Sequence, residues 1–333
     1  MSTTTIKSPT SRLRFGLARV EITPPPNIYH RLWGAARHDR ATGVHRPLTA
    51  EVLVFGPSGG QPQLIRAELD LPGLVKAQHD DLLAGLSEAS GLPVTQIVVS
   101  YSHSHAAGWY VPDRFEMPGG ELIPPYLAGL RLKLQEACQD ALDQVQEVTI
   151  TYAVGRCTMA GNRDYWDVAN GTYACGFNPD APADEAVIVA RVTEEAGHLV
   201  AVVVNYACHP TTLAWGNTLL SPDYVGAMRQ VIEQATGAIC VFTLGACGDQ
   251  GPRDGFVGDP AIADRNGRQL AYAALSALES MDPPATDFAY QGPVVSGATL
   301  GTWAAVPLTE ARQAEVAVFG GGTHTVELPV RPG

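Results

Sequence analysis

Residues 97–105 read IVVSYSHSH, an apolar run followed directly by two histidines. The consecutive β-branched residues that open this run predict a strand buried on both faces. A second run, LVAVVVNY over residues 199–206, predicts another strand, and the residues ACHP that follow it place His209 directly before Pro210. A third run, ICVFTL over residues 239–244, opens into a glycine-rich loop over residues 245–252. Buried strands that end in polar loops are typical of the sheet in an α/β protein.

The remaining pattern alternates between strands and helices. Further runs rich in β-branched residues predict strands over residues 15–22, 50–55, 148–153 and 186–192. Helical periodicity predicts helices over residues 74–89, 125–144, 222–235 and 260–281. Some predicted strands follow one another without a helix, so the sheet should contain both parallel and antiparallel pairs. We therefore predict an α/β fold with a layered mixed β-sheet flanked by helices.

The domain organisation is predicted from a break near residue 282. The chain shows no linker before Asp282, where Pro283 and Pro284 interrupt it after the last strong helical pattern. We expect an α/β metal-hydrolase domain over residues 14–281 and an incomplete β-rich segment over residues 282–333. An apparent strand just before Val330 ends this segment with nothing to cover it.

Composition and charge exclude some classes of function. Of the 333 residues, 45% are hydrophobic, which suits a globular protein with a sizeable core. The net charge of −12 arises from 34 acidic and 22 basic residues without a basic block, so we expect no nucleic-acid partner. The N-terminus lacks the apolar stretch of a signal peptide, and no apolar run is long enough to span a bilayer. We expect a cytoplasmic protein without a membrane span.

The strand-end histidines are the candidate site. If the backbone stays extended, His103 and His105 point to the same side, so that one can bind a metal and the other can move protons. The alternative is a pair of loop histidines that face solvent. His209 alone would more often be a hydrogen-bonded core residue, but a second strand-end histidine favours a metal site, because imidazole suits zinc. We expect the three loops after these strands to converge on one crevice.

Two further residues have open roles. Asp223, in the sequence Ser221-Pro222-Asp223, fits a helix start with serine as the cap and proline at the first position, and it could instead belong to the site. Arg163 could present its guanidinium to a substrate oxygen or form a surface salt bridge. The sequence contains no G-x-S-x-G, phosphate-loop, H-E-x-x-H or EF-hand pattern, which leaves a histidine-based metal site as the candidate chemistry.

Several segments, taken in order, resemble the neutral/alkaline non-lysosomal ceramidase family. They begin with ARVEITP at residues 18–24, GVH at residues 43–45 and HSH at residues 103–105. They continue with NR at residues 162–163, NPD at residues 178–180, NYACHPT at residues 205–211, SPD at residues 221–223 and GD at residues 248–249. The order of the segments is more specific than any one of them, and the resemblance covers roughly residues 14–280.

The resemblance implies a zinc-dependent hydrolase of an N-acyl amide bond. It implies that His103 and His209 bind Zn2+, that His105 lies beside the reaction, and that Arg163 is the family arginine. We expect Asp249 to orient or complete the metal site, and a small-molecule or lipid-like N-acyl compound to be the substrate. The serine of the family's Gly-Asp-x-Ser-Pro motif is Gly251 here, so any reaction must rely on water activated by the metal.

The family's glutamate and tyrosine ligands come from a region beyond Gly333, so we expect a divergent, C-terminally truncated member. A catalytic zinc site normally has three protein ligands, and Asp70, Asp249 and His105 are candidates to complete it. The competing hypothesis is a noncatalytic relative that binds a metal or ligand without turnover.

Overall fold

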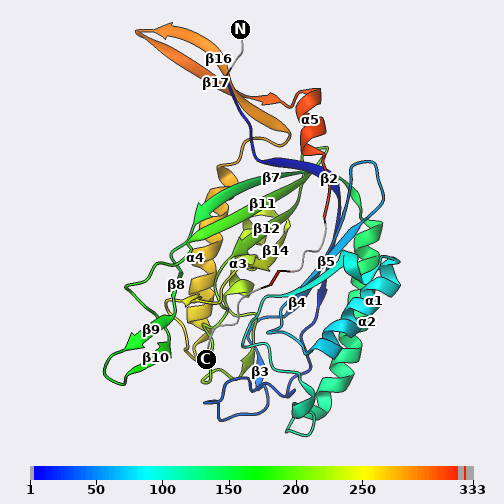
Figure 1. The fold of residues 1–333 in the computed structure, drawn as a ribbon, viewed down its shortest axis with the longest axis vertical. Coiled ribbons are helices and arrows are strands. Elements are labelled where there is room, and N and C mark those ends of the chain that lie inside the picture. The colour runs from blue at the N-terminus through cyan, green and yellow to red at the C-terminus, as the bar shows by residue number, and fades with distance from the viewer. Residues whose placement is uncertain (1–3, 322–325, 328–333) are drawn as a thin grey trace.

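A computed structural model describes residues 4–321 and 326–327, and its centre is a large mixed sheet (Figure 1). The eight strands lie in the order β14-β12-β11-β7-β2-β4-β5-β6. In chain order they are β2 (Thr10–Glu21), β4 (Thr49–Gly56), β5 (Leu64–Leu69), β6 (Ile97–Tyr101), β7 (Gln146–Arg156), β11 (Ala186–Glu194), β12 (Leu199–Tyr206) and β14 (Ile239–Leu244). The pairs β5–β6 and β12–β14 are parallel, and the other neighbours are antiparallel. The predicted α/β fold with a mixed sheet is confirmed.

The sheet bends so that its two ends approach each other. Strand β14, at one end of the order, contacts β5 and β6 at the other end. Twist accumulates across a sheet of this width, and curling is the usual result. The inner face encloses a small apolar core with Phe15 and Leu17 from β2, Leu53 from β4 and Val241 from β14. Segments that follow β6 and β12 can therefore meet, although many strands separate them in the sheet.

Two pairs of helices cover the outer face of the sheet, one on each half (Figure 1). Helices α1 (Lys76–Ser90) and α2 (Ile123–Asp143) pack together and cover the half that contains β2, β4 and β6. Helices α3 (Tyr224–Thr236) and α4 (Pro260–Glu279) pack together and cover β7, β11 and β14. Within the described ranges, no helix is both long enough and apolar enough to cross a lipid bilayer.

The start of α3 differs from the prediction. The helix begins at Tyr224, and Asp223 is its cap because the Asp223 carboxylate accepts the Tyr224 N–H at 2.7 Å. Ser221 instead accepts the Asp223 N–H through its hydroxyl at 2.9 Å, and Pro222 lies before the cap. The predicted roles of Ser221 as the cap and Pro222 as the first helical residue were therefore wrong. The acidic residue itself satisfies the first free N–H of the helix.

Short strands join loops at the edge of the main sheet. Strand β3 (Gly43–Val44) pairs with β13 (Leu219–Leu220), and β8 (Ala160–Asn162) pairs with β15 (Gln250–Pro252). Strands β9 (Asp164–Asp167) and β10 (Thr172–Cys175) form a hairpin. The remaining short helices are η1 (Val94–Gln96), η2 (Pro112–Arg114), η3 (Gly120–Leu122) and α5 (Glu310–Val316).

A long hairpin projects from the body of the protein (Figure 1). It consists of β16 (Thr286–Ser296) and β17 (Ala298–Pro307), and β1 (Thr5–Ile6) pairs with β16. The segment before β2 is tied to its base, since the Ser8 N–H donates to the Asp287 carboxylate at 3.0 Å. The division of the chain at residue 282 stays a prediction, and the strand expected just before Val330 lies outside the described residues.

Candidate metal site

The segment after β6 carries His103 and His105. The extended backbone that we assumed from the sequence is not found here, because His103 has a φ angle of 65°. This left-handed conformation is uncommon for a residue with a side chain. Backbone hydrogen bonds hold the turn, from His103 N–H to Leu71 O at 2.9 Å and from His105 N–H to Pro210 O at 3.2 Å. The turn leaves the Nε2 atoms of the two histidines 3.4 Å apart.

His209 follows β12 and is buried, with 7% of its surface exposed. Its N–H donates to Gln250 O at 3.1 Å, and its Nδ1 lies 2.6 Å from Cys247 O. Both acceptors belong to the glycine-rich loop after β14. This loop therefore fixes both the backbone and the ring of His209.

The hydrogen bonds of the rings define which nitrogen carries the proton. A backbone carbonyl only accepts, so Nδ1 of His209 donates to Cys247 O, and Nδ1 of His103 donates to Pro72 O. Nε2 of each ring is then left with its lone pair, which is the arrangement typical of histidines that bind metals. His105 differs, because its Nδ1 is buried and has no partner in the part of the chain that the structure describes.

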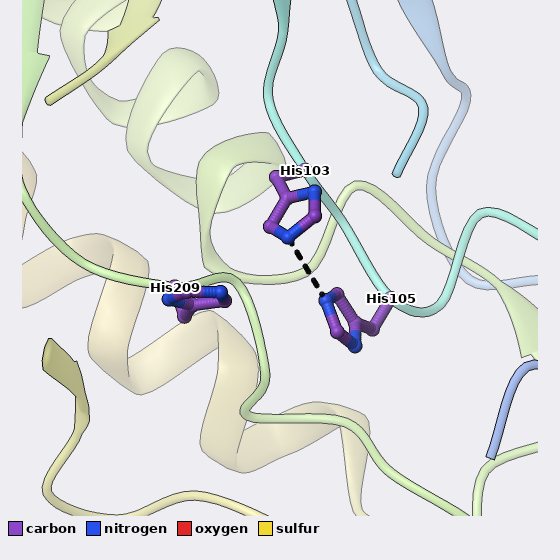
Figure 2. Close-up of side chains that lie close together, drawn as sticks. All are labelled: His103, His105 and His209. Carbon is purple, nitrogen blue, oxygen red and sulfur yellow. Dashed lines mark hydrogen bonds between the residues drawn. The ribbon is translucent and has the colours of Figure 1, made fainter. Parts of the chain in front are cut away.

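The three imidazoles form one cluster (Figure 2). Their ligand atoms all lie within 4.8 Å of one another, so a single metal ion could be held by all three. The ring centroid of His103 lies 4.8 Å from that of His105 and 4.9 Å from that of His209. The alternative of a solvent-facing pair does not hold, because the His103 and His105 side chains are both half-buried.

Burial and neighbouring charge set the protonation of the cluster. Burial, with a further contribution from the neighbouring His103, His209 and Arg163, lowers the pKa of His105 to about 3. Burial also lowers the pKa of His209, against the opposing effect of its hydrogen bond to Cys247. Both rings are therefore neutral at pH 7, and the neutral imidazole is the form that binds metal ions.

Arg163 lies between β8 and β9, and its positive charge acts on the histidine cluster. Its N–H donates to Asp249 O at 2.9 Å, which ties its backbone to the loop after β14. Its half-buried side chain makes no hydrogen bond or ion pair with the described residues, so the alternative of a surface salt bridge does not hold. Its charge lowers the pKa of both His105 and His209. An unpaired guanidinium beside neutral imidazoles can donate hydrogen bonds to a substrate oxygen.

Asp249 and Gly251 lie on the same loop. The Asp249 side chain is exposed and is not part of the histidine cluster. Gly251 is buried in β15, paired with Gly161 of β8. A Cβ atom added at Gly251 would meet Thr211 Oγ1 at 3.7 Å, an ordinary contact, and the Thr211 hydroxyl is itself buried without a partner among the described residues. This position therefore has room for a Cβ atom.

Asp70 and Asp223 have structural partners. Asp70 is fully buried and forms an ion pair with Arg229, which also pairs with Glu51 at 3.2 Å. Asp223 caps α3 and also accepts the Leu213 N–H at 2.8 Å. Neither carboxylate belongs to the histidine cluster. For Asp223, the capping role that the sequence left open is the one that the structure has.

Aromatic residues that were not predicted from the sequence lie beside the cluster. The Trp33 ring lies 5.2 Å from the His105 ring, and Trp33 also contacts Trp215 and Phe256. All three aromatic residues lie in loops, where no periodic pattern marks them. Only Trp215, six residues after His209, lies close in sequence to a candidate histidine, which is a weak signal that could have pointed to it.

Comparison with known proteins gives a structural match. No protein-family model and no curated protein sequence matches the chain. The crystal structure of neutral ceramidase from Pseudomonas aeruginosa superimposes with a TM-score of 0.65 and 18% identity, over 86% of this chain and 48% of that chain. A structure of ceramidase complexed with C2 superimposes with a TM-score of 0.66 and 18% identity, over 88% of this chain and 50% of that chain. The chain thus spans about half the length of the ceramidase structures that it matches. Over the matched half of those chains, this protein has the fold of neutral ceramidase, as the order of its sequence motifs predicted.

Proposed function

We propose that the protein is a zinc-dependent hydrolase of an amide or ester bond. The observation that carries the proposal is the histidine cluster, in which two rings have their Nδ1 protons bound by backbone carbonyls and their Nε2 lone pairs left for a metal. These two rings, His103 and His209, are the proposed ligands. The neutral ceramidase fold makes an N-acyl amide the preferred substrate class, which includes both small molecules and lipid-like compounds.

The donor set fits zinc. Imidazole nitrogen is a common zinc ligand, and a catalytic zinc site keeps at least one position free for the reaction. When bound, zinc supplies Lewis acidity toward a carbonyl oxygen and toward water. The carbonyl partners Pro72 and Cys247 would orient the ligand rings and raise their basicity.

The other side chains take roles that follow from their contacts. His105 has no carbonyl partner at Nδ1, so its ring is not oriented as a ligand and is available to accept a proton from water and to donate it to the leaving amine. The unpaired guanidinium of Arg163 would hold the carbonyl oxygen, on which negative charge develops during hydrolysis. Asp249 acts through its backbone, since its carbonyl positions Arg163.

The first test is zinc analysis of the purified chain. We expect near-stoichiometric zinc in the parent and its loss in His103→Ala and His209→Ala, because each removes a proposed ligand. His79→Ala is the matched control, since His79 is half-buried and bound to the Tyr101 hydroxyl, outside the cluster. Zinc that is absent from the parent, or retained in both ligand variants, would contradict the proposed metal site.

The second test is hydrolysis of a panel of N-acyl amides and esters by the zinc-loaded protein. Turnover that disappears in His105→Ala while zinc is retained would support the assigned role of that residue. Stoichiometric zinc without turnover of any substrate would favour the competing hypothesis of a noncatalytic metal-binding protein, for which the glycine at position 251 is the specific observation.

A further inference from the structure

Three aromatic side chains form a continuous surface beside His105, which we call the aromatic wall (Trp33, Trp215 and Phe256). The ring of Trp33 lies edge-on to both others, at centroid distances of 6.0 Å from Trp215 and 5.6 Å from Phe256. Trp215 and Phe256 are stacked at 6.3 Å with an angle of 13° between their planes. Since Trp33 also contacts the His105 ring at 5.2 Å, the wall begins at the histidine cluster.

The backbone holds the wall in place at some cost. Phe256 has a φ angle of 57°, a left-handed conformation that is unfavourable for an aromatic residue. Its N–H donates to Thr211 O at 3.0 Å, and the next residue, Val257, donates to Thr212 O at 2.8 Å. These bonds align the Phe256 segment with the loop that follows His209. Strained residues that are kept by their surroundings are concentrated at functional sites.

The wall is open to a ligand at one end. Trp215 is 45% exposed, unusual for a tryptophan that takes part in a ring cluster. It borders an open groove of about 680 Å³, lined by Ala35, Arg37, His38, Trp215, Gly216 and Thr218. At the inner end, Nε1 of Trp33 is buried without a partner among the described residues, so an N–H donor is left for an oxygen atom.

We propose that the aromatic wall binds an aryl group attached to the acyl carbon, so that aryl-acyl amides are preferred substrates of this protein. The inference rests on the proposed hydrolase function, because it places the scissile bond at the histidine cluster. Trp33 is the member of the wall that contacts His105, so the part of an acyl group that lies against Trp33 is next to the histidine cluster. The unpartnered Trp33 N–H would donate a hydrogen bond to the carbonyl oxygen of that acyl group, together with Arg163.

The arrangement of the rings favours an aryl group over an alkyl chain. Aromatic pairs in edge-on or offset stacked geometry gain affinity beyond the area that they bury, on the order of a fewfold to tenfold. The ring planes of Trp33 and Trp215 lie at 77° to each other, so a third ring between them could be stacked on one and edge-on to the other. An alkyl chain of equal area would gain affinity from its burial but not from ring–ring interactions.

The test compares two conservative variants of Trp215 on a matched pair of substrates, the benzoyl and hexanoyl amides of one amine. Trp215→Leu removes the ring and keeps an apolar side chain, whereas Trp215→Phe keeps a ring. We expect Trp215→Leu to raise KM for the benzoyl amide about tenfold and for the hexanoyl amide less than about threefold, with Trp215→Phe close to the parent. Trp303→Leu is the control, since Trp303 is 40% exposed and stacks on Phe288 in the remote β16–β17 hairpin.

Benzoate binding, measured by calorimetry, separates this inference from the hydrolase proposal because it needs no turnover. Benzoate binding that weakens in Trp215→Leu, in a protein that hydrolyses neither amides nor esters, supports the wall and contradicts the hydrolase. Equal losses on the benzoyl and hexanoyl amides, or equal effects of Trp215→Leu and Trp303→Leu, overturn the aryl preference while leaving the hydrolase intact. Absence of both benzoate binding and hydrolysis overturns both.

Discussion

The Nδ1 atom of His209 lies 2.6 Å from the carbonyl oxygen of Cys247, in the loop that follows a neighbouring parallel strand. One backbone group thereby fixes the tautomer of a proposed metal ligand. The ring of His209 is also in contact with His103, at a centroid distance of 4.9 Å. Two segments that are more than one hundred residues apart thus meet with their Nε2 lone pairs available.

Zinc should stabilise the folded protein through these rings. A ligand that binds only the folded state adds about 2.7 kcal/mol to the free energy of unfolding at a free concentration of 100 Kd. We expect this gain in chemical denaturation with zinc relative to chelator, and its loss in His209→Ala. An equal gain in parent and variant would show that zinc binds elsewhere.

Replacing Gly251 by serine should be tolerated and should raise hydrolysis. The added Cβ meets only Thr211 Oγ1, at 3.7 Å, so the free energy of unfolding should change by less than about 1 kcal/mol. The new hydroxyl could stabilise developing charge, and we expect kcat to rise about tenfold or more. The measurement is steady-state kinetics on an N-acyl amide.

The matched control is Gly161→Ser on the paired strand. There a Cβ would lie 2.6 Å from the Phe177 ring, so we expect a loss of about 1–3 kcal/mol in stability. Equal destabilisation by both substitutions would mean that position 251 has no room for a side chain.

Arg163→Met should lower activity without lowering stability. The guanidinium makes no hydrogen bond or ion pair with the described residues, so we expect unfolding to change by less than about 0.5 kcal/mol. Loss of a charge that holds the carbonyl oxygen should reduce kcat/KM about a hundredfold. Arg268→Met, on the exposed side of α4, is the control that should leave both quantities unchanged. A small effect of Arg163→Met on kcat/KM would remove this residue from the mechanism.

Asp70→Asn should destabilise the protein and leave zinc binding intact. Asp70 is an ion-pair partner of Arg229 in a fully buried network with Glu51, and breaking such a pair costs about 3 kcal/mol or more. Urea denaturation and zinc analysis of the same sample give the two readings. Loss of zinc at unchanged stability would instead make Asp70 the third metal ligand.

Glu68 should make stability depend on pH. Burial raises the pKa of this carboxyl from 4.5 to about 7, against the opposing effect of Arg66. The folded state thus binds a proton that the unfolded state has released, so the contribution of Glu68 to stability is lost as pH rises from about 4.5 to about 7. We expect Glu68→Gln to gain about 2 kcal/mol relative to the parent between pH 5 and pH 8 in chemical denaturation. A difference that does not vary with pH would contradict this shift.

The sequence by itself determined the buried elements. Strands β12 and β14 begin and end at the predicted residues, because largely apolar runs between polar loops leave little choice of boundary. Strand β5 was not predicted, since Arg66 and Glu68 interrupt its apolar pattern. These charged side chains lie on the face opposite to Ile65 and Ala67, and only pairing with β4 and β6 shows them to belong to a strand.

Only the tertiary structure decided how the candidate residues meet. The sequence placed His103, His105 and His209 at strand ends, which is a local property of the chain. Their contact depends on the bend of the sheet, which brings β14 against β5 and β6, and on the left-handed turn at His103. Neither is encoded in a short pattern, because sheet curvature sums the twist of many strand pairs and the turn is held by backbone partners from distant loops. The ion pairs of Asp70 and the aromatic wall depend on the same long-range packing.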